Sequence, residues 1–172
     1  MSRYQHTITD PANTVKSQIK DARVSFKNTR ETSRVIQGLK INKAITYLNA
    51  VIKKEKCVPM RRYARGVSRT SQAKEFHTDR GRWPVKSCEF FLKLLKNLKA
   101  NAKFREIDEN ELVLESVTVN KAKVIHGRLY RAYGRVNAFD SHPCHIQIVA
   151  KVIKENVPMI SEEEKQKIIK SN

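Results

Sequence analysis

The residues that could bind a metal are few in this chain. The densest group is His142-Pro143-Cys144-His145, and histidine and cysteine are the usual ligands of zinc. A structural zinc site needs four converging ligands, and no second Cys or His pair lies near this group. In an extended strand, Cys144 and His145 would point to opposite faces. We therefore expect the polar beginning of a half-buried strand here, and we predict no metal and no cofactor.

Catalytic residues are not apparent either. Cys88 falls on the apolar stripe of a predicted helix, where a buried and unreactive thiol is expected. The paired acids Asp108-Glu109 and Glu162–Glu164 are expected at solvated turns or helix ends. No glycine-rich phosphate-binding loop stands between a strand and a helix. We predict that the chain is not an enzyme.

Positive charge is the strongest chemical feature of the sequence. The 172 residues include 35 Lys and Arg against 17 Asp and Glu, which gives a net charge of +18. Such a charge repels itself, so the expected partner is a polyanion, and nucleic acid is the leading candidate. Three cysteines at scattered positions are typical of a reducing compartment. No run is long and apolar enough for a membrane span, so no membrane partner is expected.

The charge is concentrated in two segments. Residues 53–86 carry eleven basic side chains against three acids, and residues 120–139 carry five basic side chains and no acid. The far end of the chain, residues 155–172, is nearly neutral. Basic runs are usually solvated surface, but here arginine dominates and aromatic residues are interleaved. Arginine binds phosphate through two parallel bonds, and aromatic rings stack on unpaired bases, which favours folded RNA over DNA.

Local patterns suggest how the first part of the chain is built. Residues 1–21 show weak periodicity and are expected to form an extended arm. Val24 and Phe26 alternate with polar residues, which indicates a short strand. Asn28 and Glu31 have the spacing of a capping box, so a helix with Asn28 as its N-cap is expected to follow.

Two further helices are indicated by apolar residues at three-and-four spacing. One covers residues 41–52, with Asn42 as its expected N-cap. The other has Pro84 at its first position, where a missing N–H is harmless, and an apolar stripe from Cys88 to Ala102.

Two strand patterns, Leu112–Val119 and Cys144–Ile153, enclose a long basic stretch. The simplest connection is a single long antiparallel hairpin that turns near residues 133–136. Val113 and Val117 have the same parity and are expected on one face. Because a long polar two-stranded ribbon is marginal alone in water, we expect this hairpin to be flexible in isolation.

The predicted fold is α+β, with a small sheet packed on three helices, a long protruding two-stranded hairpin and a basic irregular insertion. Residues 22–153 are expected to form one domain, with the insertion at 57–83. The hairpin is expected at 112–153 with its tip near 131–137, and residues 154–172 form a tail. The insertion shows no periodicity, and a long irregular loop makes sense if another molecule supplies its order.

Beyond these patterns, the chain contains short blocks in a specific order between Arg23 and Ile153. The blocks are Phe26-Lys27-Asn28-Thr29-Arg30-Glu31-Thr32, Cys57-Val58-Pro59, Arg61-Arg62-Tyr63, Gly66-Val67, Gln72-Ala73-Lys74, Gly81-Arg82-Trp83-Pro84, Lys86-Ser87, Val119-Asn120-Lys121-Ala122, Tyr130-Arg131-Ala132-Tyr133-Gly134-Arg135 and Pro143-Cys144-His145-Ile146. In order and spacing the chain resembles the universal ribosomal protein family called L twenty-two in bacteria and L seventeen in older eukaryotic naming. It is similar to the eukaryotic and archaeal form, of which the insertion is characteristic.

The resemblance implies a body bound to large-subunit ribosomal RNA and a hairpin that lines the nascent-peptide exit tunnel. It implies contacts with neighbouring large-subunit proteins and with the nascent peptide, a cytosolic ribosome, and no homo-oligomer. The implied tunnel-lining tip is Arg131, Ala132, Tyr133, Gly134, Arg135, Val136 and Asn137. The implied RNA-binding residues are Lys27, Arg30, Arg61, Arg62, Tyr63, Arg65, Arg69, Lys74, Arg80, Arg82, Trp83, Lys86, Lys121, Arg128, Tyr130, Arg131 and Arg135.

The sequence departs from the family in two places and leaves two other functions open. The hairpin limb Val124–Gly127 is less basic than in eukaryotic members, and the tail lacks a lysine-rich extension.

A free-standing RNA- or DNA-binding protein, of the chaperone or chromatin type, would share the basic surface without needing the long hairpin. An enzyme acting on RNA would need an acid–base set, for which His142 and His145 are the candidates.

Overall fold

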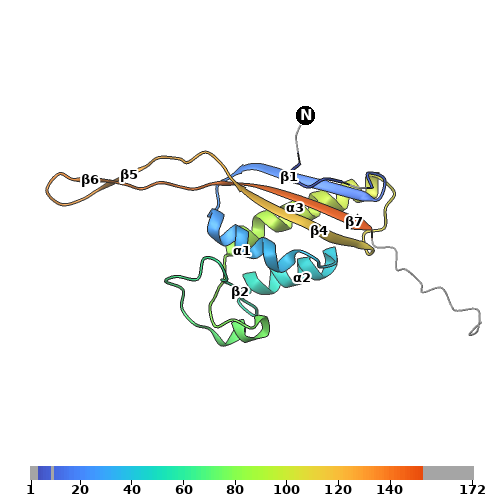
Figure 1. Ribbon diagram of the computed structural model, residues 1–172, viewed down its shortest axis with the longest axis horizontal. Coiled ribbons are helices and arrows are strands. Elements are labelled where there is room, and N and C mark those ends of the chain that lie inside the picture. The colour runs from blue at the N-terminus through green and yellow to red at the C-terminus, as the bar shows by residue number, and fades with distance from the viewer. Residues whose placement is uncertain (1–3, 9, 153–172) are drawn as a thin grey trace, which may run out of the picture.

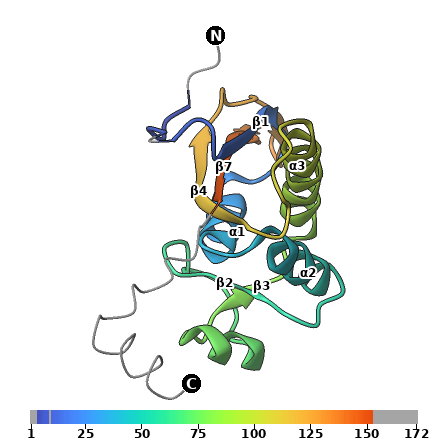
Figure 2. The same ribbon diagram turned by 90° about the vertical axis from the view of Figure 1, so that its right-hand side faces the viewer.

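A three-stranded antiparallel sheet forms the centre of the fold, which the computed structural model describes for residues 4–8 and 10–152. Strand β7 (Cys144–Val152) lies between β1 (Thr14–Ala22) and β4 (Leu112–Lys121). The helices α1 (Phe26–Ile36), α2 (Ile41–Ile52) and α3 (Val85–Phe104) lie on one side of this sheet (Figure 2). The predicted α+β class is confirmed. The predicted tail, residues 154–172, lies outside the described residues.

The core lies between the sheet and α3. On β7, Ile146 and Ile148 are fully buried, while the alternate residues are mostly more exposed, as strand periodicity requires. On α3, Phe91, Leu95 and Leu98 are fully buried at helical spacing. Burial of each such side chain stabilises the fold by about 1.5–3 kcal/mol before entropy is subtracted. The apolar stripe predicted for the third helix is therefore the stripe that meets the sheet.

The segment predicted as an extended arm contains an edge strand instead. Within residues 1–21, β1 begins at Thr14 and pairs antiparallel with β7. Ser17 on this strand donates a hydrogen bond to Asn97 on α3, with 3.0 Å between the oxygens. The short strand expected at Val24 and Phe26 is also wrong, because Phe26 begins α1.

The helix starts differ from those predicted. α1 begins three residues early, with Ser25 at its N-cap, so Asn28 lies inside the helix and the predicted capping box with Glu31 does not form. Asn42 lies inside α2 rather than at its N-cap. α3 begins directly after Pro84, one residue later than predicted. All three errors are local, and the helices themselves are confirmed.

Strand β4 departs from simple alternation between Leu114 and Ser116, where its register with β7 shifts. One extra residue at such a bulge moves the following side chains to the opposite face. Leu114 and Val117 are both buried, whereas Val113 is only half-buried. The prediction that Val113 and Val117 share a face is therefore wrong.

The basic insertion, residues 57–83, has more structure than predicted. Strands β2 (Val58–Pro59) and β3 (Gly81–Arg82) pair, and a 3-10 helix, η1, covers Ser71–Phe76. The Tyr47 hydroxyl of α2 donates a hydrogen bond of 2.7 Å to the Cys57 carbonyl oxygen, which anchors the insertion at its start. Burial raises the pKa of this phenol above its ordinary value. The insertion therefore has contacts of its own that hold it against the helices.

The hairpin arm, residues 122–143, projects far beyond the body (Figure 1). Strands β5 (Arg128–Tyr130) and β6 (Val136–Ala138) pair antiparallel near its end. The Arg131 amide donates to the Arg135 carbonyl oxygen at 2.8 Å, so the turn falls within the predicted range. Gly134 has φ +63°, which suits the left-handed backbone of this turn.

Candidate nucleic-acid interface

Three segments meet at the N-terminal end of α1. The rings of Phe26 on α1 and Tyr63 in the insertion pack edge to face, with 6.3 Å between centroids. The Lys27 ammonium lies 5.8 Å from the Tyr63 ring centroid, and the Lys121 ammonium lies 5.7 Å from that of Phe26. We call these four residues the aromatic junction. It brings together one end of a helix, the insertion and the base of the hairpin arm.

A buried carboxylate fixes the insertion against α1. The Glu31 side chain is 1% exposed. Its Oε1 accepts the backbone N–H groups of Arg62 at 3.1 Å and Tyr63 at 3.2 Å, and its Oε2 accepts that of Arg61 at 3.3 Å. The Arg30 guanidinium lies 3.0 Å from Oε1. These four donors offset the cost of burying the charge, because hydrogen bonds to an ionised group are stronger than neutral ones.

The backbone anchored in this way presents a cationic surface. Arg61 and Arg62 are exposed, although their amides are held by Glu31. Together with Arg30 and Arg34 of α1, they line a hollow of about 500 Å³. Arg34 was missed as a binding residue from the sequence, although it lies one helical turn after Arg30. That spacing is the signal that would have found it.

Two further arginines of the insertion, Arg80 and Arg82, combine two roles. Arg80 donates to the Ala64 carbonyl oxygen at 2.8 Å, and Arg82 donates to that of Gly66 at 3.2 Å. Each guanidinium carries several further donors, so such a bond leaves groups that can bind phosphate. Trp83, by contrast, uses its only polar hydrogen to bond a glutamine within the insertion. The predicted residues that are exposed here are Arg61, Arg62, Arg65, Arg69, Lys74, Arg80, Arg82 and Trp83.

The hairpin arm exposes every residue predicted for it. Tyr130 is 76% exposed and Tyr133 is 98% exposed, which is unusual for side chains of this size. His126 pairs with Asp140 at 3.1 Å in the lower limbs. The exposed predicted residues of the arm are Arg128, Tyr130, Arg131, Ala132, Tyr133, Gly134, Arg135, Val136 and Asn137.

The predicted residues therefore do not form one patch. Lys27, Arg30, Arg61–Tyr63 and Lys121 come together at the aromatic junction and on the adjoining face of α1. Lys86 lines a separate hollow of about 510 Å³ with Arg23 and His142, which adjoins the aromatic junction through Ser25 and Pro143. The hairpin tip lies far from the insertion (Figure 1). A ligand that contacts all of these sites must be extended over much of the molecule.

The alternative sites considered from the sequence do not assemble. Cys144 is buried in the core, while the His145 Nδ1 accepts the Asp21 amide at 3.1 Å on the other face of the sheet. Burial raises the pKa of the Cys88 thiol to about 12, which leaves it protonated. In residues 4–8 and 10–152, no three His, Cys, Asp or Glu side chains gather as metal ligands would. Within the same residues, no helix is long and apolar enough to cross a membrane.

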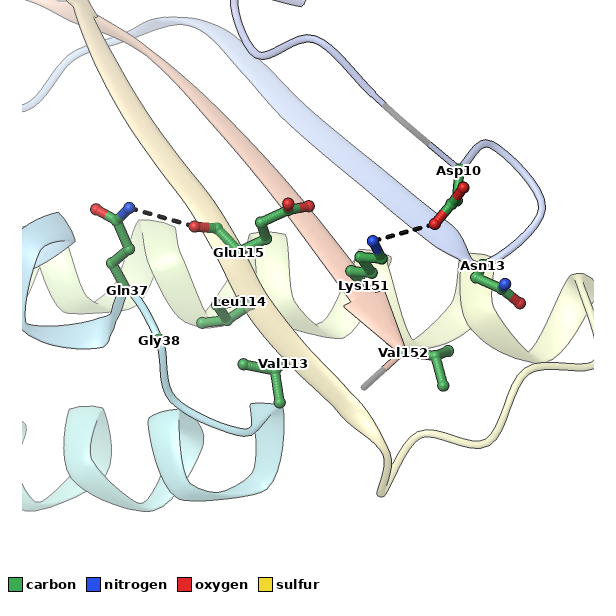
Figure 3. Close-up of a pocket in the computed structure, with 9 residues that line it drawn as sticks. All are labelled: Asp10, Asn13, Gln37, Gly38, Val113, Leu114, Glu115, Lys151 and Val152. Atoms are coloured by element: carbon green, nitrogen blue, oxygen red, sulfur yellow. Dashed lines mark hydrogen bonds and ion pairs between the residues drawn. The ribbon is translucent and has the colours of Figure 1, made fainter. Parts of the chain in front are cut away.

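A hollow of about 590 Å³ lies near the other end of the sheet, but it is not cationic (Figure 3). Its Lys151 pairs with Asp10 at 3.1 Å, and Glu115 adds a second acid. Across this hollow, the side-chain amide of Gln37 donates a hydrogen bond to the Glu115 carbonyl oxygen at 3.2 Å. Because the charges nearly cancel and no catalytic set is present among the lining residues, this hollow is not a candidate for polyanion binding.

The fold and the surface define a class of protein: a basic α+β body with an arginine-rich insertion and a long exposed hairpin. The chain belongs to the family described as ribosomal protein L22p/L17e, which matches residues 17–151. This is a family of structural ribosomal proteins rather than a class of enzymes.

Three relatives show how far the likeness extends, and each is named large ribosomal subunit protein uL22. The protein of Theileria annulata is 47% identical over 87% of this chain and 80% of its own length. The protein of Neurospora crassa is 44% identical over 95% of this chain and 90% of its own length. The protein of Maconellicoccus hirsutus is 40% identical over 97% of this chain and 90% of its own length. The resemblance found in the sequence is thereby confirmed.

Proposed function

We propose that this protein is a structural constituent of the large subunit of the cytosolic ribosome. The observation that carries this proposal is the likeness to proteins named for that subunit, which extends over nearly the whole chain. The net charge of +18 is what a protein embedded in RNA requires, because free in solution it repels itself. No chemical step is part of the proposed role.

In this role, the basic insertion and the exposed face of α1 bind and cross-bridge large-subunit ribosomal RNA. Their arginines and lysines neutralise phosphates, and the released counterions supply much of the binding free energy. Glu31 prepares the surface in advance by holding the backbone of Arg61, Arg62 and Tyr63 in one conformation. Binding then costs less ordering of the chain.

The hairpin arm is proposed to line the nascent-peptide exit tunnel. Its length and its exposed basic tip support this, since all the residues from 128 to 142 are exposed. Arg128, Arg131 and Arg135 would bind RNA phosphates, while Tyr133 would face the passing peptide. Neighbouring large-subunit proteins complete the expected contacts, and the protein is not expected to form homo-oligomers.

Sedimentation separates this function from that of a free-standing nucleic-acid binder. A tagged copy of the full chain, expressed in cells, should sediment with the large subunit in a sucrose gradient at moderate salt. A chromatin or chaperone protein bound through loose charge contacts would be released, because each such contact weakens with salt. The proposal fails if the tagged protein stays at the top of the gradient while other large-subunit proteins do not.

A pair of charge variants tests the role of the tip in the same assay. Arg131→Ala with Arg135→Ala should reduce incorporation into the large subunit. Lys165→Ala with Lys167→Ala removes the same charge from the tail and should have a smaller effect. Equal effects of the two pairs would contradict the proposed role of the hairpin tip.

A further inference from the structure

A small pocket opens beside the aromatic junction. It has a volume of about 400 Å³, and its wall includes the rings of Phe26 and Tyr63 together with Val124 and Pro143. Lys27 and Lys121 also line it, and among the described residues around it none is acidic. Its wall is therefore apolar and aromatic, and its charge is positive.

These properties select one kind of occupant. Phe26 and Tyr63 meet at 72°, and in a T-shaped pair the edge-on ring keeps both faces uncovered by its partner. Such a ring face is a surface on which a flat base can stack. The cations over these rings are Lys27 and Arg62 at Tyr63 and Lys121 at Phe26. All three side chains are exposed, so they can turn from the rings and leave a face to the base, and the two lysines can turn towards a phosphate. An acidic peptide would satisfy the lysines but not the aromatic wall.

We propose that this pocket holds a single unpaired nucleotide of the bound RNA, with its base stacked at the aromatic junction and its phosphate between Lys27 and Lys121. The inference rests on the proposed RNA-binding function and makes it more specific. It assigns this surface to a bulged or looped-out nucleotide, whereas phosphate contacts alone would accept any RNA helix of suitable shape.

The pocket is preformed in the protein. The Tyr63 amide is held by the buried Glu31 carboxylate at 3.2 Å. The Phe26 amide donates to the His142 carbonyl oxygen at 3.3 Å, and the Ala122 amide donates to that of Pro143 at 3.1 Å. Each of the three segments around the pocket is thus tied by its backbone, so little ordering is required when a base enters.

The test compares two short RNA hairpins that differ by one bulged nucleotide, which is the fluorescent base 2-aminopurine. The full chain should bind the bulged RNA about 5- to 150-fold more tightly than the fully paired RNA, the range that one base stacked on an aromatic side chain supplies. The fluorescence of 2-aminopurine should fall on binding, because stacking quenches it.

Variants at Tyr63 separate stacking from charge. Tyr63→Phe should keep the preference for the bulged RNA, whereas Tyr63→Leu should abolish it. Neither should change the slope of affinity against salt, since the phosphate contacts remain. Phe104→Ala removes a ring that is 91% exposed at the end of α3, so this control should bind both RNAs as the wild type does. Unfolding midpoints verify that each variant is folded.

The outcomes distinguish this inference from the proposed function. If the wild type binds both RNAs equally, the pocket takes no base and the inference is wrong, while RNA binding stands. The same follows if the preference survives in Tyr63→Leu. If the wild type binds neither RNA, the RNA-binding function and the inference fail together.

Discussion

At the scale of single residues, Glu31 determines how the insertion meets the body. Three successive amide groups, those of Arg61, Arg62 and Tyr63, converge on its carboxylate. Runs of backbone N–H groups of this kind bind anions, and here the anion belongs to the protein itself. The negative charge also reduces the repulsion between Arg30 and the arginines of the insertion.

Replacing Glu31 with glutamine tests this anchor. The amide keeps one oxygen but places an NH₂ group against backbone donors, so at least one buried group loses its partner. We expect Glu31→Gln to lower the free energy of unfolding in urea by about 1–3 kcal/mol, and to speed amide exchange in residues 61–63.

The exposed Glu55 provides the matched control. Glu55→Gln should change the free energy of unfolding by no more than about 0.5 kcal/mol, as is usual for surface substitutions. Equal effects of the two substitutions would show that the carboxylate of Glu31 has no special role.

The buried thiol of Cys88 makes the free energy of unfolding depend on pH. Burial is the main cause that raises the pKa of this thiol to about 12, and Glu89 adds to it. Well below pH 9, where a free thiol titrates, the thiol is neutral in both the folded and the unfolded chain, so its contribution is fully present. As the pH rises towards 12, only the unfolded chain ionises, and this contribution is lost.

A comparison with Cys88→Ala isolates the effect from other titrations. The wild type should exceed the variant in free energy of unfolding at about pH 8, because the alanine leaves a cavity. This difference should shrink by about 2 kcal/mol at about pH 10.5. A difference that stays constant with pH would contradict a buried neutral thiol.

At the scale of elements, α3 and the hairpin arm differ most in how much of their surface is buried. α3 buries Phe91, Leu95 and Leu98 completely. Between the central sheet and the three pairs of β5 and β6, the limbs of the arm are joined by the Ile125–Ser141 bridge and by the Ala122–Pro143 and Phe139–Gly127 backbone hydrogen bonds. A two-stranded ribbon without a buried face is at best marginally stable in water.

Hydrogen exchange of the isolated protein checks this contrast. Amides of α3 should be protected to nearly the free energy of global unfolding, whereas residues 124–141 should exchange with little protection. Similar protection in both would refute the expectation that the arm is ordered only by its partner. Addition of RNA should raise protection in the arm if RNA is that partner.

The same contrast explains what could be predicted from the sequence. α3 and the long hairpin were predictable because their periodicities are strong and local. The strand β1 was missed because the polar Ser17 stands on its inward face between Val15 and Ile19, so the apolar side of the alternation is interrupted. The order of the insertion was missed because it depends on Glu31, about thirty residues away, which was assigned to a cap.

At the scale of the whole molecule, the residues that stabilise the fold are different from the residues that carry the positive charge. The core is apolar and contains one buried ion, Glu31, among the described residues. The predicted binding residues lie on the insertion, on α1, at the start of α3, at the end of β4 and on the arm, and apart from Arg30 and Tyr63 their side chains are exposed. The body can therefore fold by itself, while the basic surfaces remain available to a polyanion that extends from the insertion to the hairpin tip.

Site-specific crosslinking in ribosomes that carry a nascent chain tests the central claim most directly. A photoreactive residue is placed at Tyr133 on the hairpin tip, or at the exposed Lys74 of the insertion as the control. The proposed function predicts crosslinks to the nascent peptide from position 133, and crosslinks to ribosomal RNA alone from position 74. If position 133 never reaches the nascent peptide in assembled ribosomes, the hairpin does not line the tunnel and the proposed role of the arm is wrong.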